Sequence, residues 1–138
     1  MSYLLDTCVL SELRKSIPLN IREWFSSKDS DLFFISVVTV AELWDGIERL
    51  SASHKRRDLE EWFRDEVHSR FKDRIVSIDD RVAKEWGSLN AKLQKKGRMV
   101  GVQDIYIAAT AKSWDLSLIT LNVKDFEHMD LMVINPWA

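Results

Sequence analysis

The 138-residue sequence predicts one α/β domain, residues 1–138, built on a parallel sheet of about five strands with helices on both faces. Short apolar segments alternate along the chain with stretches whose apolar residues recur at helical spacing, a pattern typical of parallel strands joined by helices. The segment Leu32–Val38 is apolar almost throughout, as expected of a strand covered on both sides. The length is that of a single compact domain, and no linker or internal repeat divides it.

Each element follows from a local pattern. The apolar segments predict strands at residues 3–5, 32–38, 74–78, 117–120 and 131–134. Helical spacing predicts helices over residues 9–13, 18–28, 39–50, 59–71, 82–95 and 102–111. Pro18 suits the first turn of a helix, and Lys95-Lys96-Gly97 is typical of a helix end. Residues 121–126 are expected to form a loop with one helical turn.

The composition excludes several classes of protein. A net charge of −2 argues against general attraction to nucleic acid, although a local basic face remains compatible with it. The single cysteine, Cys8, rules out a disulfide framework within the chain and fits a reducing compartment. The sequence has no signal-peptide pattern, and no apolar run approaches the ~18 residues of a membrane span. We therefore expect a cytoplasmic protein with no membrane partner.

Motifs that mark other chemistries are missing. The four glycines have neither of the spacings that bind phosphate groups, and there is no Gly-x-Ser-x-Gly turn for a serine nucleophile. The three histidines stand alone and Cys8 has no cysteine partner, so a zinc site is not expected. If the chain carries out a reaction, carboxylates must perform it.

Four acids occupy positions that a parallel sheet would bring together. Asp6 ends the first strand, Glu42 opens the helix after the second, Asp104 opens the central helix, and Asp125 follows the fourth strand. The carboxyl ends of parallel strands share one edge, where open α/β sheets bind ligands. Clustered carboxylates repel one another, and a hard divalent cation removes that repulsion. Oxygen ligands favour Mg²⁺ or Mn²⁺, which can activate water against a phosphodiester.

Each acid also has a structural explanation. Thr39-x-x-Glu42 matches a capping box, in which the glutamate reaches back to the threonine amide. Asp104 fits the first turn of a helix, where the helix dipole favours an acid, and Asp125 fits an ordinary turn. Asp6 is the hardest to explain this way, because a carboxylate directly after a buried strand is costly unless it is paired, hydrogen-bonded or metal-bound.

Four segments resemble the signature segments of PIN domains: Leu5–Glu12, Thr39–Leu43, Asp104–Ala111 and Thr120–Phe126. They resemble more closely the VapC-type toxins of bacterial toxin–antitoxin pairs, including the FitB-like branch, as does the ending Asn135-Pro136-Trp137. The resemblance covers essentially the whole chain. It implies a PIN-like fold, a homodimer, and an Mg²⁺- or Mn²⁺-dependent endoribonuclease. It also implies a VapB-type antitoxin that covers the site, often with an arginine, and contacts operator DNA through its own domain.

The resemblance also assigns site residues. It places the metal-binding acids at Asp6, Glu42 and Asp104, with Thr7 and Thr120 supporting them.

Three positions depart from the family pattern. Cys8 stands where relatives usually have asparagine, and we interpret it as a small buried residue, with a redox role as the alternative. Leu121 replaces a frequent arginine. The family's fourth acid falls at Asn122 or Asp125. Only Asp125 is acidic here, so it is assigned the catalytic role, and Asn122 is left to bind a metal-bound water.

Two basic groups are candidates for RNA phosphates: Lys55, Arg56 and Arg57 in one, Lys96 and Arg98 in the other. Such contacts position a strand without reading its sequence, and both groups are equally explained as solvated helix ends.

Trp44, Trp62 and Phe63 are candidates for a groove that binds an antitoxin helix. Core packing is the better explanation for at least two of the three.

Other functions remain open at this stage. A housekeeping PIN nuclease acting on ribosomal RNA or DNA would share the acids, but a small domain without an added RNA-binding module favours a toxin. An aspartyl-phosphate enzyme would need an acid at the position of Cys8. A non-catalytic regulatory partner would gain nothing from keeping an acid cluster that lowers its stability.

Overall fold

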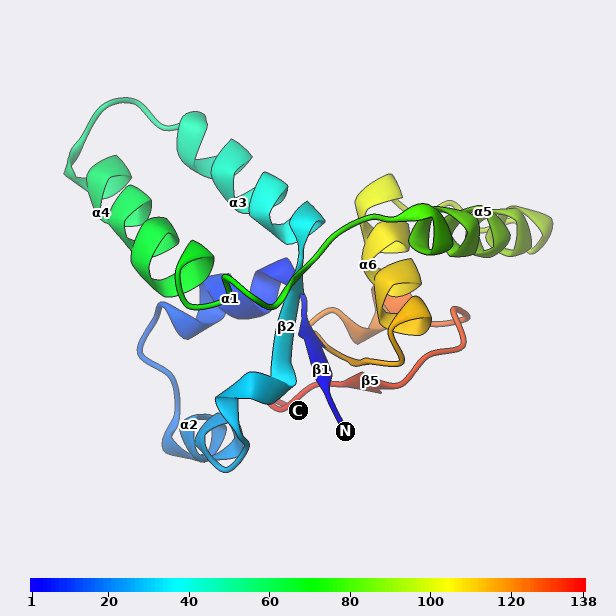
Figure 1. The fold of residues 1–138 in the computed structure, drawn as a ribbon, viewed down its shortest axis with the longest axis horizontal. Helices are drawn as coiled ribbons and strands as arrows, with labels where there is room; N and C mark the ends of the chain where they lie inside the picture. Colours follow the sequence, from blue (N-terminus) through cyan, green and yellow to red (C-terminus); the bar gives the residue numbers. More distant parts are fainter.

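The computed structural model describes residues 1–138 and contains one five-stranded sheet in the order β3-β2-β1-β4-β5 (Figure 1). Every neighbouring pair of strands is parallel, as predicted. The strands are β1 (Tyr3–Leu5), β2 (Phe33–Ser36), β3 (Ile75–Val76), β4 (Ser117–Ile119) and β5 (Val133–Ile134). All five predicted strands therefore exist, and all but β1 are shorter than the apolar segments that predicted them.

Six α-helices and three shorter helical segments connect the strands. The α-helices are α1 (Thr7–Leu13), α2 (Leu19–Ser26), α3 (Val37–Glu48), α4 (His54–Trp62), α5 (Asp80–Lys95) and α6 (Val102–Ser113). The short segments are the 3₁₀-helices η1 (Ser30–Leu32) and η3 (Val123–Phe126), and η2 (Phe63–His68), a π-helix that continues α4. The single helical turn expected after the fourth strand is η3.

Several predicted boundaries were wrong, and two of them share one physical cause. The second strand ends at Ser36, because the Ser36 hydroxyl accepts a hydrogen bond from the Val38 amide at 3.0 Å and caps α3. The predicted helix 59–71 begins earlier, at His54, where the Ser53 hydroxyl accepts from the Arg56 amide at 3.2 Å. In both cases a serine cap set the boundary, and the apolar pattern alone did not show it.

The end of α5 was predicted correctly. Gly97 has a φ of 71°, and its amide donates to the Gln94 carbonyl at 2.9 Å. The Arg98 amide donates to the Leu93 carbonyl, also at 2.9 Å. These two bonds form the Schellman motif that a glycine with positive φ permits. The motif fixes the direction in which the chain leaves α5 toward the short loop before α6.

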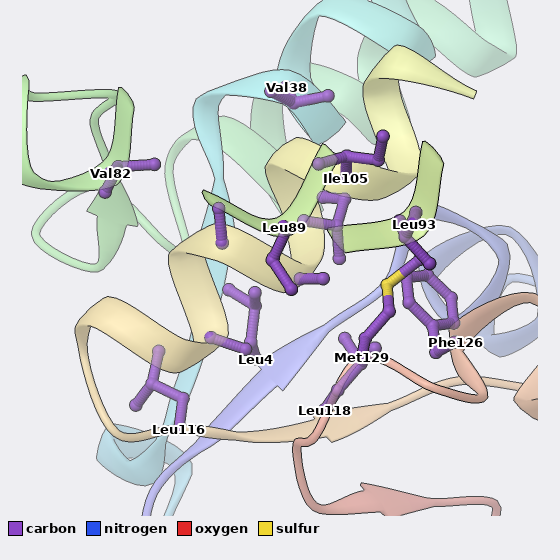
Figure 2. Close-up of a cluster of buried hydrophobic side chains, with 14 residues drawn as sticks. Leu4, Val38, Val82, Leu89, Leu93, Ile105, Leu116, Leu118, Phe126 and Met129 are labelled. Atoms are coloured by element: carbon purple, nitrogen blue, oxygen red, sulfur yellow. The ribbon is translucent and has the colours of Figure 1, made fainter. Parts of the chain in front are cut away.

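Two hydrophobic clusters cover the two faces of the sheet. On one face, Leu4 of β1 and Leu118 of β4 pack with Leu89 of α5 and Ile105 of α6 (Figure 2). On the other, alternate strand residues such as Leu5 pack against α1 and the π-helix, because successive strand side chains point to opposite faces. The sheet therefore has helices on both sides, as the continuous apolar segments predicted.

The strand order creates a switch point between β1 and β4. From the central β1 the chain moves outward to β2 and β3, then returns to add β4 and β5 on the other side. In open α/β sheets, ligands bind outside the carboxyl ends of the strands at such a point. In Figure 1 the end of β2 leads into α3, which contacts α6 beside it. None of the helices has the length and apolar character to span a membrane.

Candidate active site

Asp6 lies at the switch point and is anchored to both strands that form it. It follows β1 directly, and its backbone amide donates to the Ile119 carbonyl of β4 at 2.9 Å. Its side chain is only 6% exposed, and one oxygen, Oδ1, accepts from the Thr7 amide at 2.9 Å. The other, Oδ2, accepts from the Thr120 hydroxyl at 2.8 Å. The buried carboxylate is thus hydrogen-bonded, one of the three states that its position required.

Burial raises the pKa of Asp6, while the hydrogen bonds from Thr120 and Thr7 lower it by less. Thr120 itself is held in place, because its oxygen also accepts from the Asn122 amide at 3.0 Å. The support predicted for Thr120 is therefore a direct hydrogen bond. Asn122 takes part through its backbone amide, and its side chain is exposed.

Glu42 faces Thr7 rather than the start of its own helix. The Thr7 hydroxyl donates to Glu42 Oε1 at 2.8 Å and lies 3.0 Å from the Thr39 hydroxyl. The capping-box interpretation is wrong, because Ser36 caps α3 and Thr39 is already its third residue. Glu42 is therefore in the second turn and does not open the helix. Thr7 contacts both acids, through its amide to Asp6 and its hydroxyl to Glu42.

The pKa of Asp104 is affected by the other three predicted acids. It is the third residue of α6, in the first turn as predicted, behind the N-cap Gly101. Burial first, and then the negative charges of Asp6, Asp125 and Glu42, raise its pKa to about 6. The charges that raise the pKa of this carboxyl all belong to acids. The structure therefore brings the four predicted acids into one electrostatic cluster.

The carboxylates do not converge on a single point. No group of three His, Cys, Asp or Glu side chains is arranged so that it could hold a metal ion. Asp125 is the most open of the four, an exposed residue of η3. The donor set consists of carboxylate oxygens with one buried member, which suits a hard divalent cation.

Sequence reasoning missed the contacts of Cys8. Its thiol donates to Asp6 Oδ2 at 3.6 Å and lies 3.5 Å from the Thr120 hydroxyl. The residue is only partly buried, and burial raises the pKa of its thiol, so the thiol is protonated at neutral pH. Its place two residues after Asp6, on the first turn of α1, was the available signal.

The basic group on α4 lies away from the acids. Arg56 pairs with Glu48 at 3.1 Å and with Glu60 at 2.8 Å, and it donates to the Leu50 carbonyl at 2.8 Å. Because Glu48 is the last residue of α3, this group, which includes Lys55 and Arg57, lies at the far tip of the α3–α4 hairpin (Figure 1).

The second basic group, Lys96 and Arg98, follows α5, and Arg98 lines a cavity that also contains Asp104.

The three candidate groove aromatics differ in burial. Trp62 and Phe63 are partly buried against the second hydrophobic cluster, so the core-packing explanation applies to these two. Trp44 is 40% exposed, with its ring 5.1 Å from that of Phe63.

Comparison with known proteins identifies the family. The family model "PIN domain" matches residues 3–131. The chain belongs to the PIN domain family. This PIN domain is 33% identical to the protein named toxin FitB of Neisseria gonorrhoeae, over 97% of both chains. It is 31% identical to the VapC ribonuclease Y4jK of Sinorhizobium fredii, over 96% of both.

Solved structures agree with the fold. The crystal structure of FitAcB from Neisseria gonorrhoeae contains a chain that is similar to this PIN domain with a TM-score of 0.88 and 32% identity, over 98% of both chains. A chain of DNA-bound VapBC from Salmonella typhimurium gives a TM-score of 0.82 at 29% identity, covering 99% of this chain and 98% of that one. The predicted PIN-like fold and the predicted family are both confirmed.

Proposed function

We propose that this PIN domain, residues 1–138, is the toxin of a VapC-type toxin–antitoxin pair and acts as a cytoplasmic endoribonuclease. The observation that carries the proposal is a group of acids at the carboxyl edge of the sheet. Thr7 hydrogen-bonds to both Asp6 and Glu42, and burial first, then the charges of Asp6, Asp125 and Glu42, raise the pKa of Asp104 to about 6. A cluster of carboxylates lowers the stability of the fold, so its presence favours a functional role. The names of the similar proteins, toxin FitB and VapC ribonuclease, support the same activity.

We infer that Asp6, Glu42 and Asp104 hold Mg²⁺ or Mn²⁺. Their donors are all oxygens, and a divalent cation would remove the repulsion that acts on Asp104. When bound, such an ion supplies activation of water and stabilisation of the leaving oxygen of a phosphodiester. Asp125, the most exposed of the four acids, is the proposed fourth catalytic acid and lies on the solvent-exposed side of the site.

The chain's own residues prepare this site. Thr120 and the Thr7 amide fix both oxygens of Asp6, so the buried carboxylate keeps one orientation. The Thr7 hydroxyl fixes Glu42 relative to Asp6. Because these side chains are already hydrogen-bonded, little reorganisation is needed when a substrate arrives, which favours catalysis.

A cognate VapB-type antitoxin is the proposed partner. Similar chains come from complexes described as FitAB bound to an IR36 DNA fragment, with 31% identity and a TM-score of 0.89, and as DNA-bound VapBC. An arginine of the partner would neutralise the carboxylates and block access to them. We propose that this chain forms a homodimer and meets operator DNA only through the antitoxin.

The test is RNA cleavage by purified, antitoxin-free protein with Mg²⁺, with Mn²⁺ and with EDTA, comparing wild type with Asp6→Asn. We expect metal-dependent cutting that falls at least 100-fold in Asp6→Asn. Asp45→Asn is the matched control, because Asp45 is an exposed acid of α3 outside the cluster, and it should cut like wild type. Cutting by Asp6→Asn at the wild-type rate would show that the site is assigned wrongly.

If the enzyme cuts only one particular RNA, the cleavage assay would show no product with other RNAs. Growth on expression then decides, because a toxin should arrest growth in a manner that Asp6→Asn relieves. Absence of arrest, together with no cleavage of total RNA, would refute the toxin function.

A further inference from the structure

A polar cavity of about 440 Å³ opens directly beside the acid cluster. It lies between the loop that joins α5 to α6 and the region of η3, and Asp104 and Asp125 belong to its walls. The same walls carry Arg98, Met99 and Lys124. A volume of this size lies within the range of small-ligand pockets, so it has room for a nucleotide unit. The candidate active site therefore continues into a space that contains both acids and bases.

The two bases of this cavity are unpaired. Arg98 and Lys124 are exposed and take part in none of the eight salt bridges of the molecule. Arg56 shows the contrast, since its guanidinium is bound by two glutamates and a carbonyl. Cations that have no partner in the chain, next to carboxylates proposed to cut RNA, are available to bind phosphate oxygens.

Met99 adds an apolar surface to the same cavity. Its side chain is 99% exposed, more than any other large hydrophobic residue of the chain. The Schellman motif at Gly97 and Arg98 fixes the start of this loop, so the position of Met99 follows a defined turn. A polarisable thioether in solvent contributes nothing to the core, but it can contact the face of an aromatic ring such as a nucleobase.

We propose that this cavity is a subsite for single-stranded RNA, in which Arg98 and Lys124 bind a phosphate next to the one being cut and Met99 contacts the adjoining base. The inference rests on the proposed ribonuclease function and adds positioning residues to it. Lys124 and Met99 join Arg98 in this role, whereas the basic group on α4 lies at the opposite end of its hairpin. RNA is favoured over a protein partner because the unpaired cations stand beside the cutting site itself.

The decisive measurement is the salt dependence of RNA binding. All proteins carry Asp6→Asn, so that no RNA is cut, and the probe is a fluorescein-labelled single-stranded RNA of 20 nucleotides in EDTA. The slope of log Kd against log [KCl] counts phosphate contacts, at about 0.7 for each contact with a single strand. We expect Arg98→Gln and Lys124→Gln each to reduce the slope by about 0.7, and the double variant by about 1.4. A change that only disturbed the fold would not alter the slope by one contact per charge.

Two further variants complete the design. Lys84→Gln removes the same charge from an exposed position near the start of α5, so its slope should stay that of the parent. Met99→Gln keeps the length of the side chain but makes it polar. It should weaken binding about threefold without changing the slope, because it removes an apolar contact and no charge.

Cleavage by proteins that retain Asp6 separates this inference from the proposed function. With Mg²⁺, Lys124→Gln and Arg98→Gln should raise KM about fivefold and leave kcat within about twofold, as expected for lost substrate contacts. If wild type cuts RNA but the two variants keep the parent slope and KM, the subsite is refuted and the nuclease stands. If wild type neither cuts RNA nor arrests growth while the slopes fall as expected, the nuclease is refuted and Arg98 and Lys124 remain an RNA-binding site only. Failure of the parent to bind the probe at low salt refutes the subsite.

Discussion

The two sides of the candidate site are built in opposite ways. On the β1–β4 side, Asp6 is 6% exposed and both of its carboxylate oxygens accept hydrogen bonds from the chain. On the α6–η3 side, Asp125 is exposed, and the neighbouring cations Arg98 and Lys124 have no salt-bridge partner. The difference indicates separate roles. The β1–β4 side, the closed half, fixes the orientation of the Asp6 carboxylate, and the α6–η3 side, the open half, is accessible to a ligand. Changes to the closed half should therefore have larger effects on the rate.

The largest effect expected of a supporting residue comes from Thr120. Thr120→Val keeps the shape but removes the hydroxyl that donates to Asp6 Oδ2 at 2.8 Å. A buried carboxylate left without this donor should lower the free energy of unfolding by about 1–3 kcal/mol. Cleavage should fall about 10- to 100-fold because Asp6 loses its fixed orientation. Chemical denaturation and single-turnover cleavage measure the two effects.

Thr110→Val is the matched control for Thr120→Val. Thr110 is equally buried, but its hydroxyl donates only to the Tyr106 carbonyl within α6. It should retain the wild-type rate. Equal loss of activity in the two variants would mean that the hydrogen bond to Asp6 has no special role.

Asp104 should make stability depend on pH in the metal-free protein. Its pKa is about 6 in the folded state against an ordinary value of 3.8, so the folded state binds the proton more tightly. Stability therefore falls as pH rises from about 4 to 6, and the full penalty is present above that range. Asp104→Asn lacks the penalty, so in EDTA it should melt several degrees above wild type at pH 7.5 and at the same temperature near pH 4.

Magnesium provides the complementary test of Asp104. Added Mg²⁺ should raise the Tm of wild type at pH 7.5 and raise that of Asp104→Asn much less, since a bound ligand stabilises only the state that binds it. Thermal melts followed by circular dichroism are sufficient. Wild-type and variant Tm values that coincide at every pH would remove the evidence for repulsion among the acids.

Thr7 should have an intermediate effect, because it connects Asp6 to Glu42. Thr7→Val removes the hydroxyl that donates to Glu42 at 2.8 Å. It keeps the hydrogen bond from the residue 7 backbone amide to the Asp6 carboxylate. We expect cleavage to fall about 5- to 20-fold, with little change in stability because the hydroxyl is only partly buried. Thr7→Ser restores the hydroxyl and should recover most of the rate. A serine variant as slow as the valine variant would show that the methyl group matters rather than the hydrogen bond.

The smallest effect is expected at Cys8. The thiol lies 3.6 Å from Asp6 Oδ2, and a thiol is a weak donor beside the two bonds that already hold this carboxylate. Cys8→Ser and Cys8→Ala should both change the cleavage rate by less than about threefold. A tenfold loss in Cys8→Ala that Cys8→Ser restores would mean that the side chain at this position orients Asp6 and is more than a space-filling residue.

Much of the fold was predictable because its signals are local. Continuous apolar segments identified each strand, helical spacing identified all six α-helices, and Lys96-Gly97 predicted the end of α5. Two of the errors occurred where a hydroxyl competed with these apolar patterns. Ser36 ended β2 early by capping α3, and Ser53 started α4 before its apolar residues begin. A side-chain cap depends on a single residue, whereas an apolar pattern depends on many residues and does not show where one serine caps a helix.

The sequence by itself predicted that Asp6, Glu42, Asp104 and Asp125 would lie at one edge of the sheet, because parallel strands joined by helices bring their carboxyl ends to the same side. Only the tertiary structure decided how they meet. The order β2-β1-β4 places Thr120 against Asp6, and the packing of α1 beside α3 turns Glu42 toward Thr7 instead of its own helix start. It also leaves Arg98 and Lys124 unpaired around one cavity. These contacts join residues far apart in the chain, and their geometry depends on strand order and helix packing, which no local period contains.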